Sequence, residues 1–353
     1  MGIRGLNALI KKHSPDCTSY NDIKKYHGKT VAIDSSILLY KFKYACKAEN
    51  SHLIGIANRA KFYVMNGILP VFVFDGVPPD AKGITLEKRQ AAKQKIYIRL
   101  DELKEKVAES ELEQGEINSE IERLQSQLII VKKYHTEQCK EFLEKSGIPY
   151  CTAPNDAEKY CAFLQRNGIV DYTITDDSDA LTFGCSNVLK TNISKHIIEI
   201  DLAKLLYDID MNMENFVDFC ILSGCDYTES IPQIGPITAY NLIKKHRCIE
   251  TVLTNSVKTC EHFEYGVCRE IFNTFDYDIP EKFFMKKKDK NILLEFLNKH
   301  NFRENVILVM EYRKNNFNDL KVNELLIKHF NELTAVSPSD RGHVLDINGL
   351  KDP

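Results

Sequence analysis

Three short apolar segments along the chain each end in a carboxylate, and the pattern of each predicts a buried strand. They are KTVAIDSS (29–36), ILPVFVFDG (68–76) and VDYTITDD (170–177). The run Val71–Phe74 is apolar at every position, not at alternate positions, which is typical of a parallel strand covered on both faces. Helical patterns lie between these segments, so the sequence predicts an α/β fold with a mostly parallel central sheet flanked by helices.

The ends of these predicted strands carry the candidate chemistry. The carboxyl ends of parallel strands meet at one edge of a sheet, and ligands bind outside that edge. Seven carboxylates are expected there, three from strand ends and four from a helix start, a loop and a helix exit: Asp34, Asp75, Asp177, Asp156, Glu158, Asp179 and Asp226. Helix residues two apart diverge by about 200°, so Asp156 and Glu158 share a site only if Asp156 is the helix cap. Taken singly, capping explains one of Asp156 and Glu158, and an Asx turn explains Asp177 or Asp179.

So many like charges in one place require cations. Two unit charges 4 Å apart repel by about 4 kcal/mol at an effective dielectric constant of about 20. Ligands that are all oxygen select hard ions, which predicts Mg²⁺, with Mn²⁺ able to substitute. The number of carboxylates favours two ions, the arrangement used for in-line displacement at phosphorus. The sequence therefore predicts two-metal hydrolysis of a phosphodiester.

Residues 80–145 interrupt the alternation of strands and helices with a highly charged stretch that lacks proline. The pattern predicts two helices that break near Gly115, and the stretch is basic near its start and acidic on both sides of this break. A solvated helical hairpin is the simplest interpretation of such a charge pattern. Its position directly after Asp75 favours a functional role beside the acidic site.

Composition narrows the class of protein. With 353 residues and 43% hydrophobic content, the chain is long enough to bury a substantial core. It has no run of about eighteen apolar residues, and its start is too short and too polar for a secretory signal. The eleven cysteines form no CxxC pair and predict reduced thiols, and the irregular spacing of Cys248, Cys260, His262 and Cys268 argues against a zinc site. The net charge of −3 leaves nucleic-acid binding open, because the basic residues gather locally.

Several blocks of the sequence resemble the flap endonuclease branch of the XPG-type 5′ nucleases, in the same order and up to about residue 315. The blocks are MGIRGLNALI, VAIDSSILLYKF, PVFVFDGVPPDAKGITLEKR, GIPYCTAPNDAEKYCA, TDDSDALTFG and CILSGCDYTESIPQIGP. The resemblance implies that the seven carboxylates are the metal ligands. Asp156 stands where the family usually has a glutamate, so its side chain is one methylene shorter.

The resemblance also implies a PIN-like 5′ nuclease fold with a helical arch insertion and a helix-two-turn-helix. The expected boundaries are a nuclease core at 1–225 with the arch at about 80–140, a duplex-binding element at 226–260, a C-terminal helical region at 261–333 that packs on the core, and a flexible tail at 334–353. In the family the arch admits the 5′ single strand. Lys82 and Arg89 fall on the arch positions that neutralise the scissile phosphate, so they are the expected catalytic cations.

Further positions are expected to contact DNA. Tyr40 matches the family's stacking aromatic, although a core aromatic is an equally simple interpretation. In SIPQIGPITAYNLIKKH, Gly235 allows a close backbone approach, and Pro236 starts a helix whose free amides can hold a phosphate. Gln233 replaces a glycine of this motif, which leaves open whether the family's monovalent cation site persists. The expected DNA contacts are Gly2, Tyr40, Lys47, Gly235, Lys244 and Lys245.

The expected function is a structure-specific 5′ flap endonuclease with 5′–3′ exonuclease activity, acting in DNA replication and repair. Two alternatives stay open: a 5′–3′ double-strand DNA exonuclease of the same superfamily, and a non-catalytic protein that binds DNA junctions. The expected partner is branched DNA with a 5′ flap, bound by a monomer. No sliding-clamp peptide is visible, because no glutamine follows Gln233 and the tail lacks paired aromatics. The expected compartment is the nucleus for a cellular protein, or a cytoplasmic replication site for a viral one.

Overall fold

The computed structural model describes residues 2–46, 48–77, 83–106, 111–191, 196–255, 260, 262–286 and 288–300. Lys47, Lys82, residues 301–333 of the predicted C-terminal helical region and the predicted tail at 334–353 lie outside these ranges. Within them, no helix combines the length and the apolar content needed to cross a membrane.

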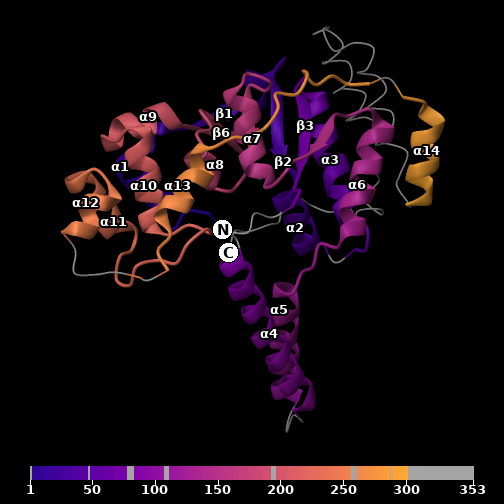
Figure 1. Ribbon diagram of the computed structural model, residues 1–353. Coiled ribbons are helices and arrows are strands. Elements are labelled where there is room, and N and C mark those ends of the chain that lie inside the picture. The colour runs from indigo at the N-terminus through magenta and orange to yellow at the C-terminus, as the bar shows by residue number, and fades with distance from the viewer. Residues whose placement is uncertain are drawn as a thin grey trace.

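A seven-stranded sheet forms the centre of the molecule, with strand order β1-β7-β6-β5-β2-β3-β4 (Figure 1). The strands are β1 (Thr18–Asp22), β2 (Thr30–Asp34), β3 (Leu69–Phe74), β4 (Tyr150–Thr152), β5 (Tyr172–Ile174), β6 (Asn187–Thr191) and β7 (His196–Asp201). Strands β2 to β6 pair in parallel, whereas β7 is antiparallel to both β6 and β1. In this register Ile33 lies between Phe72 and Ile174, so β2, β3 and β5 end together. The predicted fold class is confirmed.

Helices cover both faces of the sheet and form a separate group beside it. The α-helices are α1 (Leu6–His13), α2 (Ser35–Ala45), α3 (Ser51–Met65), α4 (Gly83–Glu105), α5 (Glu111–Gln127), α6 (Lys133–Ser146), α7 (Ala157–Arg166), α8 (Asp179–Thr182), α9 (Leu202–Ile209), α10 (Met213–Ser223), α11 (Pro236–His246), α12 (Ile249–Thr254), α13 (Tyr265–Asn273) and α14 (Lys290–Lys299). One hydrophobic cluster joins α1 and α9 to α13, which are grouped at the left of Figure 1.

The strand β3 shows why its sequence is apolar at every position. Phe72 and Phe74 pack into the cluster formed with α3 and α6 on one face of the sheet. Val71 and Val73 pack on the opposite face, in the cluster formed with α7. All four side chains are fully buried, as a parallel strand between two helical layers requires.

The helical pair α4–α5 projects away from the sheet (Figure 1). The two helices pack through a small cluster of their own, with Leu100 and Leu103 facing Ile117 and Leu124. The predicted break near Gly115 is wrong, because α5 runs through that position and the change of direction falls between α4 and α5. A glycine inside a helix costs about 1 kcal/mol, which the packing of Ile117 and Leu124 outweighs. The predicted count of two helices for 80–145 is also wrong, since α6 is a third helix.

Candidate active site

Asp34 is the most enclosed of the three strand-end carboxylates. It ends β2 and caps α2, accepting hydrogen bonds from the Ser36 amide at 3.2 Å and from the Thr175 hydroxyl at 3.0 Å. Burial is the largest of the effects that raise the pKa of Asp34 to about 7, and the negative charges of Asp75 and Asp177 add to it. The three strand-end carboxylates therefore act on one another electrostatically.

Asp75 connects the end of β3 to the start of α7. The amide of Ala157 donates a hydrogen bond of 2.8 Å to Asp75 Oδ1. Asp156 is the N-cap of α7, with the extended backbone angles φ −76° and ψ 134°, so the cap position that the sequence required is confirmed. Asp156 and Glu158 are both buried and lie in the helix turn that Asp75 contacts.

Tyr227 gathers a second set of carboxylates. Its hydroxyl donates to Asp156 Oδ2 at 3.2 Å, and its ring is buried. Burial and the negative charges of Glu158, Asp156 and Asp179 raise the pKa of Tyr227 well above its ordinary value. Asp226 directly precedes this tyrosine and is half-buried. Tyr227 therefore ties the exit of α10 to the start of α7.

The acidic run after β5 has a different role for each carboxylate. Asp176 forms an ion pair with Lys41 of α2. The Asp177 carboxylate accepts from the amide of Asp179 at 3.2 Å, and the Asp177 amide donates to the Thr175 hydroxyl at 3.1 Å. Asp179 begins α8 and is buried. Lys41 therefore neutralises Asp176, whereas Asp177 and Asp179 remain candidates for the acidic site.

We call seven residues the carboxylate edge: Asp34, Asp75, Asp156, Glu158, Asp177, Asp179 and Asp226. Hydrogen bonds tie Asp34 to Thr175, Asp75 to the start of α7, Asp156 to Tyr227, and Asp177 to the amide of Asp179. Glu158 acts on Tyr227 electrostatically, and Asp226 directly precedes Tyr227 in the chain. Among the residues that the structure describes, no three His, Cys, Asp or Glu side chains meet closely enough to define a metal site. The assignment of the seven carboxylates as metal ligands therefore stays a prediction. All eleven cysteines are free thiols, as the sequence predicts.

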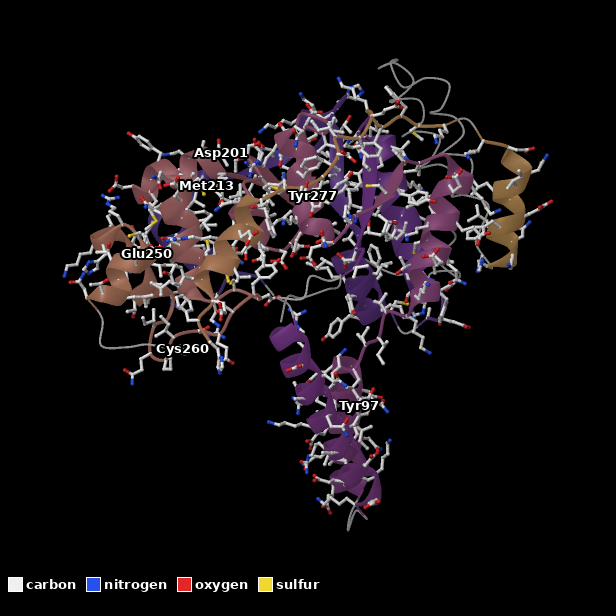
Figure 2. All side chains as sticks on the ribbon, in the orientation of Figure 1. Tyr97, Asp201, Met213, Glu250, Cys260 and Tyr277 are labelled. Carbon is white, nitrogen blue, oxygen red and sulfur yellow. The ribbon has the colours of Figure 1, made fainter. Side chains whose placement is uncertain are left out.

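Two residues that organise the carboxylate edge were not identified from the sequence. Thr175 directly precedes Asp176, and Tyr227 directly follows Asp226. This proximity to an acidic residue is the signal in the sequence that could have suggested their role in the site. Tyr277, labelled in Figure 2, adds a third link, because its hydroxyl donates to Asn155 Oδ1 at 3.3 Å. Asn155 directly precedes the cap residue Asp156, so this contact holds the start of α7 in place.

Arg89 connects the helical pair α4–α5 to the carboxylate edge. Its guanidinium lies 2.5 Å from Asp226 Oδ2, and 41% of the arginine side chain is exposed. This contact places a cation from the predicted arch at the acidic site. The other predicted catalytic cation, Lys82, lies outside the described residues, as does the predicted DNA contact Lys47.

Of the predicted DNA contacts, Tyr40 lies on α2 and Gly2 lies against Asp177. Tyr40 is 44% exposed, so its interpretation as a core aromatic is wrong. Gly2 has a φ of +88°, and a Cβ atom placed on it would come within 2.0 Å of Asp177 Oδ1. Only a residue without a side chain fits so close to this carboxylate.

The predicted duplex-binding motif has the helix that its sequence indicates. α11 begins at Pro236, with Gly235 as its N-cap, and a Cβ atom added to Gly235 would meet open space. Lys244 and Lys245 lie in the last turn of α11, and both are exposed. Gln233 adopts a left-handed φ of +65°, the conformation that a glycine in this position of the motif would adopt without strain.

Comparison with known proteins gives matches over most of the chain. Residues 1–96 match the XPG N-terminal domain, and residues 147–226 match the XPG I-region. Flap endonuclease 1 of Caenorhabditis elegans is 36% identical over 327 residues, an alignment that covers 86% of this chain and 83% of the relative. Flap endonuclease 1 of Drosophila willistoni is 39% identical over 292 residues, covering 77% of this chain and 73% of the relative.

Solved structures show the same fold. The flap endonuclease-1 from Methanococcus jannaschii is 26% identical with a TM-score of 0.61, and the match covers 84% of this chain and 95% of that one. The catalytic core of Rad2 in complex with DNA substrate has a TM-score of 0.69 at 21% identity, covering 88% of this chain and all of that one. On this evidence the chain belongs to the flap endonuclease family of XPG-type structure-specific 5′ nucleases, enzymes that hydrolyse DNA phosphodiester bonds.

Proposed function

We propose that this enzyme cuts 5′ flaps, and removes nucleotides in the 5′–3′ direction, with two divalent cations held by the carboxylate edge. The observation that carries this proposal is the position of Asp34. It is buried at the end of β2, it faces the charges of Asp75 and Asp177, and its neutral donors are a threonine hydroxyl and helix amides. Such a group of carboxylates is stable in its ionised form only beside cations.

The donor set fits magnesium. Its members offer carboxylate oxygens, the ligands that Mg²⁺ and Mn²⁺ prefer over the softer metals. Nucleases of this family use divalent metal ions. When bound, two such ions supply a metal-activated hydroxide and stabilise the leaving oxygen. Asp34, Asp75 and Asp177 would hold one side of this centre, and the carboxylates around Tyr227 would hold the other.

Arg89 is the proposed cation for the scissile phosphate. It lies at the carboxylate edge in its contact with Asp226, and a guanidinium forms bidentate contacts with phosphate as readily as with carboxylate. When DNA binds, Arg89 would exchange Asp226 for a phosphate oxygen and stabilise the charge that develops there. We assign the same role to Lys82 from its position in the family motif.

The remaining regions are assigned around this centre. We propose that 226–260 binds the duplex through α11 and that 261–333 supports the nuclease core from the C-terminal side. Tyr40 would stack on a terminal base pair, because its ring is exposed and it lies on α2, the helix that Asp34 caps. We further propose that the enzyme acts as a monomer. We also propose that it acts in the nucleus, since the relatives reported above include those of a nematode and a fly, whose cells have nuclei.

The test compares two neighbouring aspartates in a cleavage assay with labelled 5′-flap, blunt-duplex and bubble DNA in Mg²⁺. We expect Asp177→Asn to lower the single-turnover rate by roughly 100-fold or more, because it removes a proposed metal ligand. Asp176→Asn is the matched control, since Asp176 pairs with Lys41 and is outside the ligand set. An Asp177→Asn rate within a few fold of that control contradicts the metal assignment.

The substrates separate the alternatives. Incision near the base of the flap supports the flap endonuclease, whereas stepwise release of nucleotides from blunt duplex alone supports the double-strand exonuclease. Tight binding to flap DNA with no Mg²⁺-dependent cleavage of any substrate supports the non-catalytic junction-binding protein.

A further inference from the structure

The amino-terminal segment forms a bridge between the carboxylate edge and the duplex-binding region. The amide of Ile3 donates to Ser178 Oγ at 3.0 Å, in the loop between Asp177 and α8. One residue later, the amide of Arg4 donates to the Gly224 carbonyl at 3.0 Å, and the Arg4 carbonyl accepts from Ser223 Oγ at 2.6 Å. The backbone at Arg4 is therefore fixed on both sides.

Glycines on either side of this residue allow the bridge to touch both regions. Gly2 lies against the Asp177 carboxylate. Gly5 has a φ of +69°, and a Cβ atom added to it would lie 2.4 Å from the Pro236 side chain, the first residue of α11. Four consecutive residues thus reach from a proposed metal ligand to the proposed duplex-binding helix, and Figure 1 shows the N-terminal end at the centre of the molecule.

The side chain of Arg4 is exposed at this junction. It passes the end of α10, where its Cδ and Nε atoms lie 3.6 Å from the position of a Cβ atom added to Gly224. Arg89 and Arg269 each form an ion pair with an aspartate, whereas Arg4 forms none with any residue in the described part of the chain. Its guanidinium is therefore available to an anion from outside the protein.

The neighbouring helix has no cation at the end that faces this junction. The basic residues of α11 lie in its last turn, and the first turn begins with Pro236 and the exposed Ile237. A duplex that lies along α11 toward the carboxylate edge passes Arg4 before it reaches the metal ligands. Phosphate contacts of this kind fix the register of a protein on a duplex.

We propose that Arg4 is a substrate-positioning residue that binds a backbone phosphate of the duplex between α11 and the scissile bond. The inference rests on the proposed function and adds a contact to it. Two extended residues span at most about 7 Å, and B-DNA rises about 3.4 Å per base pair. Because Arg4 is two residues from Gly2, the phosphate that it binds lies a few nucleotides from the scissile one.

The test measures binding and its salt dependence with labelled flap DNA in EDTA, using fluorescence anisotropy at several KCl concentrations. We expect Arg4→Ala to weaken binding about fivefold to tenfold and to reduce the slope of log K against log salt by about 1, because one phosphate contact is lost. Arg4→Lys keeps the charge and should retain the slope. Lys24→Ala is the matched control, since it removes an exposed cation beside the edge strand β1.

Cleavage in Mg²⁺ supplies a second readout. At saturating DNA, we expect Arg4→Ala to incise the flap at more positions than the parent protein, because the register of the duplex is less fixed. The inference would be overturned if Arg4→Ala had the same salt slope of binding and the same incision pattern as Lys24→Ala. If Arg4→Ala unfolds, loss of the salt slope in Arg4→Gln decides instead. Failure of the parent protein to cut any flap rejects the proposed function, whereas the binding slopes still test the contact.

Discussion

The carboxylate edge and the helical pair α4–α5 serve one proposed site but are built in opposite ways. Five of the seven carboxylates are buried, and their positions are fixed by strand ends, caps and hydrogen bonds to the body of the protein. The helical pair is mostly exposed and, within the described residues, has a separate cluster that includes Leu100 and Ile117. Among the described residues, the ion pair of Arg89 with Asp226 links it to the carboxylate edge.

The carboxylate edge holds its side chains in fixed positions, whereas the helical pair α4–α5 can change its contacts. Ligands for metal ions need positions held within fractions of an ångström, which rigid strand ends and helix caps provide. Arg89 must instead exchange its carboxylate partner for the scissile phosphate. A side chain on an exposed helix makes such an exchange more easily than a side chain in a packed core. Perturbing the edge should therefore change the chemistry, and perturbing the pair should change how DNA reaches it.

The largest effect is expected from Asp34→Asn. The amide keeps the shape of the carboxylate and can still accept from Thr175, but it loses the charge that a metal ion requires. We expect the single-turnover rate on a 5′ flap in Mg²⁺ to fall by roughly 100-fold or more. Circular dichroism should show an unchanged fold. A rate close to that of the parent would remove Asp34 from the metal centre.

Arg89→Ala should produce the next largest effect, a loss of about 10-fold to 100-fold in the single-turnover rate, because a cation aimed at the reacting phosphate is lost. Metal binding, measured by titration calorimetry with Mn²⁺, should be retained. Lys95→Ala is the control, since Lys95 is exposed further along the same helix. Equal rates for the two variants would show that Arg89 serves only as the ion-pair partner of Asp226.

The pH dependence of the free energy of unfolding should also distinguish the carboxylate edge from the helical pair. The pKa of Asp34 is raised from its ordinary value of 3.8 to about 7 in the folded protein. In EDTA its contribution to stability is therefore complete below about pH 4 and is lost as pH rises through about 7, on the order of 4 kcal/mol. Urea unfolding of the parent and of Asp34→Asn checks this, since the variant should lack that part of the slope. Parallel pH profiles would contradict it.

Gly115→Ala is the smallest change and acts on the helical pair alone. No atom lies within 4 Å of a Cβ added at this position, and α5 is continuous through it. We expect the substitution to stabilise α5 by about 0.5 to 1 kcal/mol, seen as slower hydrogen exchange in 111–127, with flap cleavage unchanged. Slower cleavage with the same exchange protection would indicate that the arch must bend at Gly115 when DNA enters.

The sequence alone determined the local features of this protein. Fully apolar runs such as Val71–Phe74 require a strand covered on both faces, and the cap Asp156 and the first helical residue Pro236 set where helices begin. The acidic residues at strand ends followed from the same patterns, because a parallel sheet brings the ends of its strands to one edge. These features depend on neighbouring residues only, so the sequence contains them directly.

Only the tertiary structure decided which distant residues meet. The pairing of Asp176 with Lys41, the link of Tyr227 to Asp156, and the bridge from Gly2 to Pro236 join positions far apart in the chain. The continuous helix through Gly115 was also decided by packing, which outweighed the weak local preference of glycine. No short-range pattern encodes such contacts, because they depend on how complete layers pack against one another.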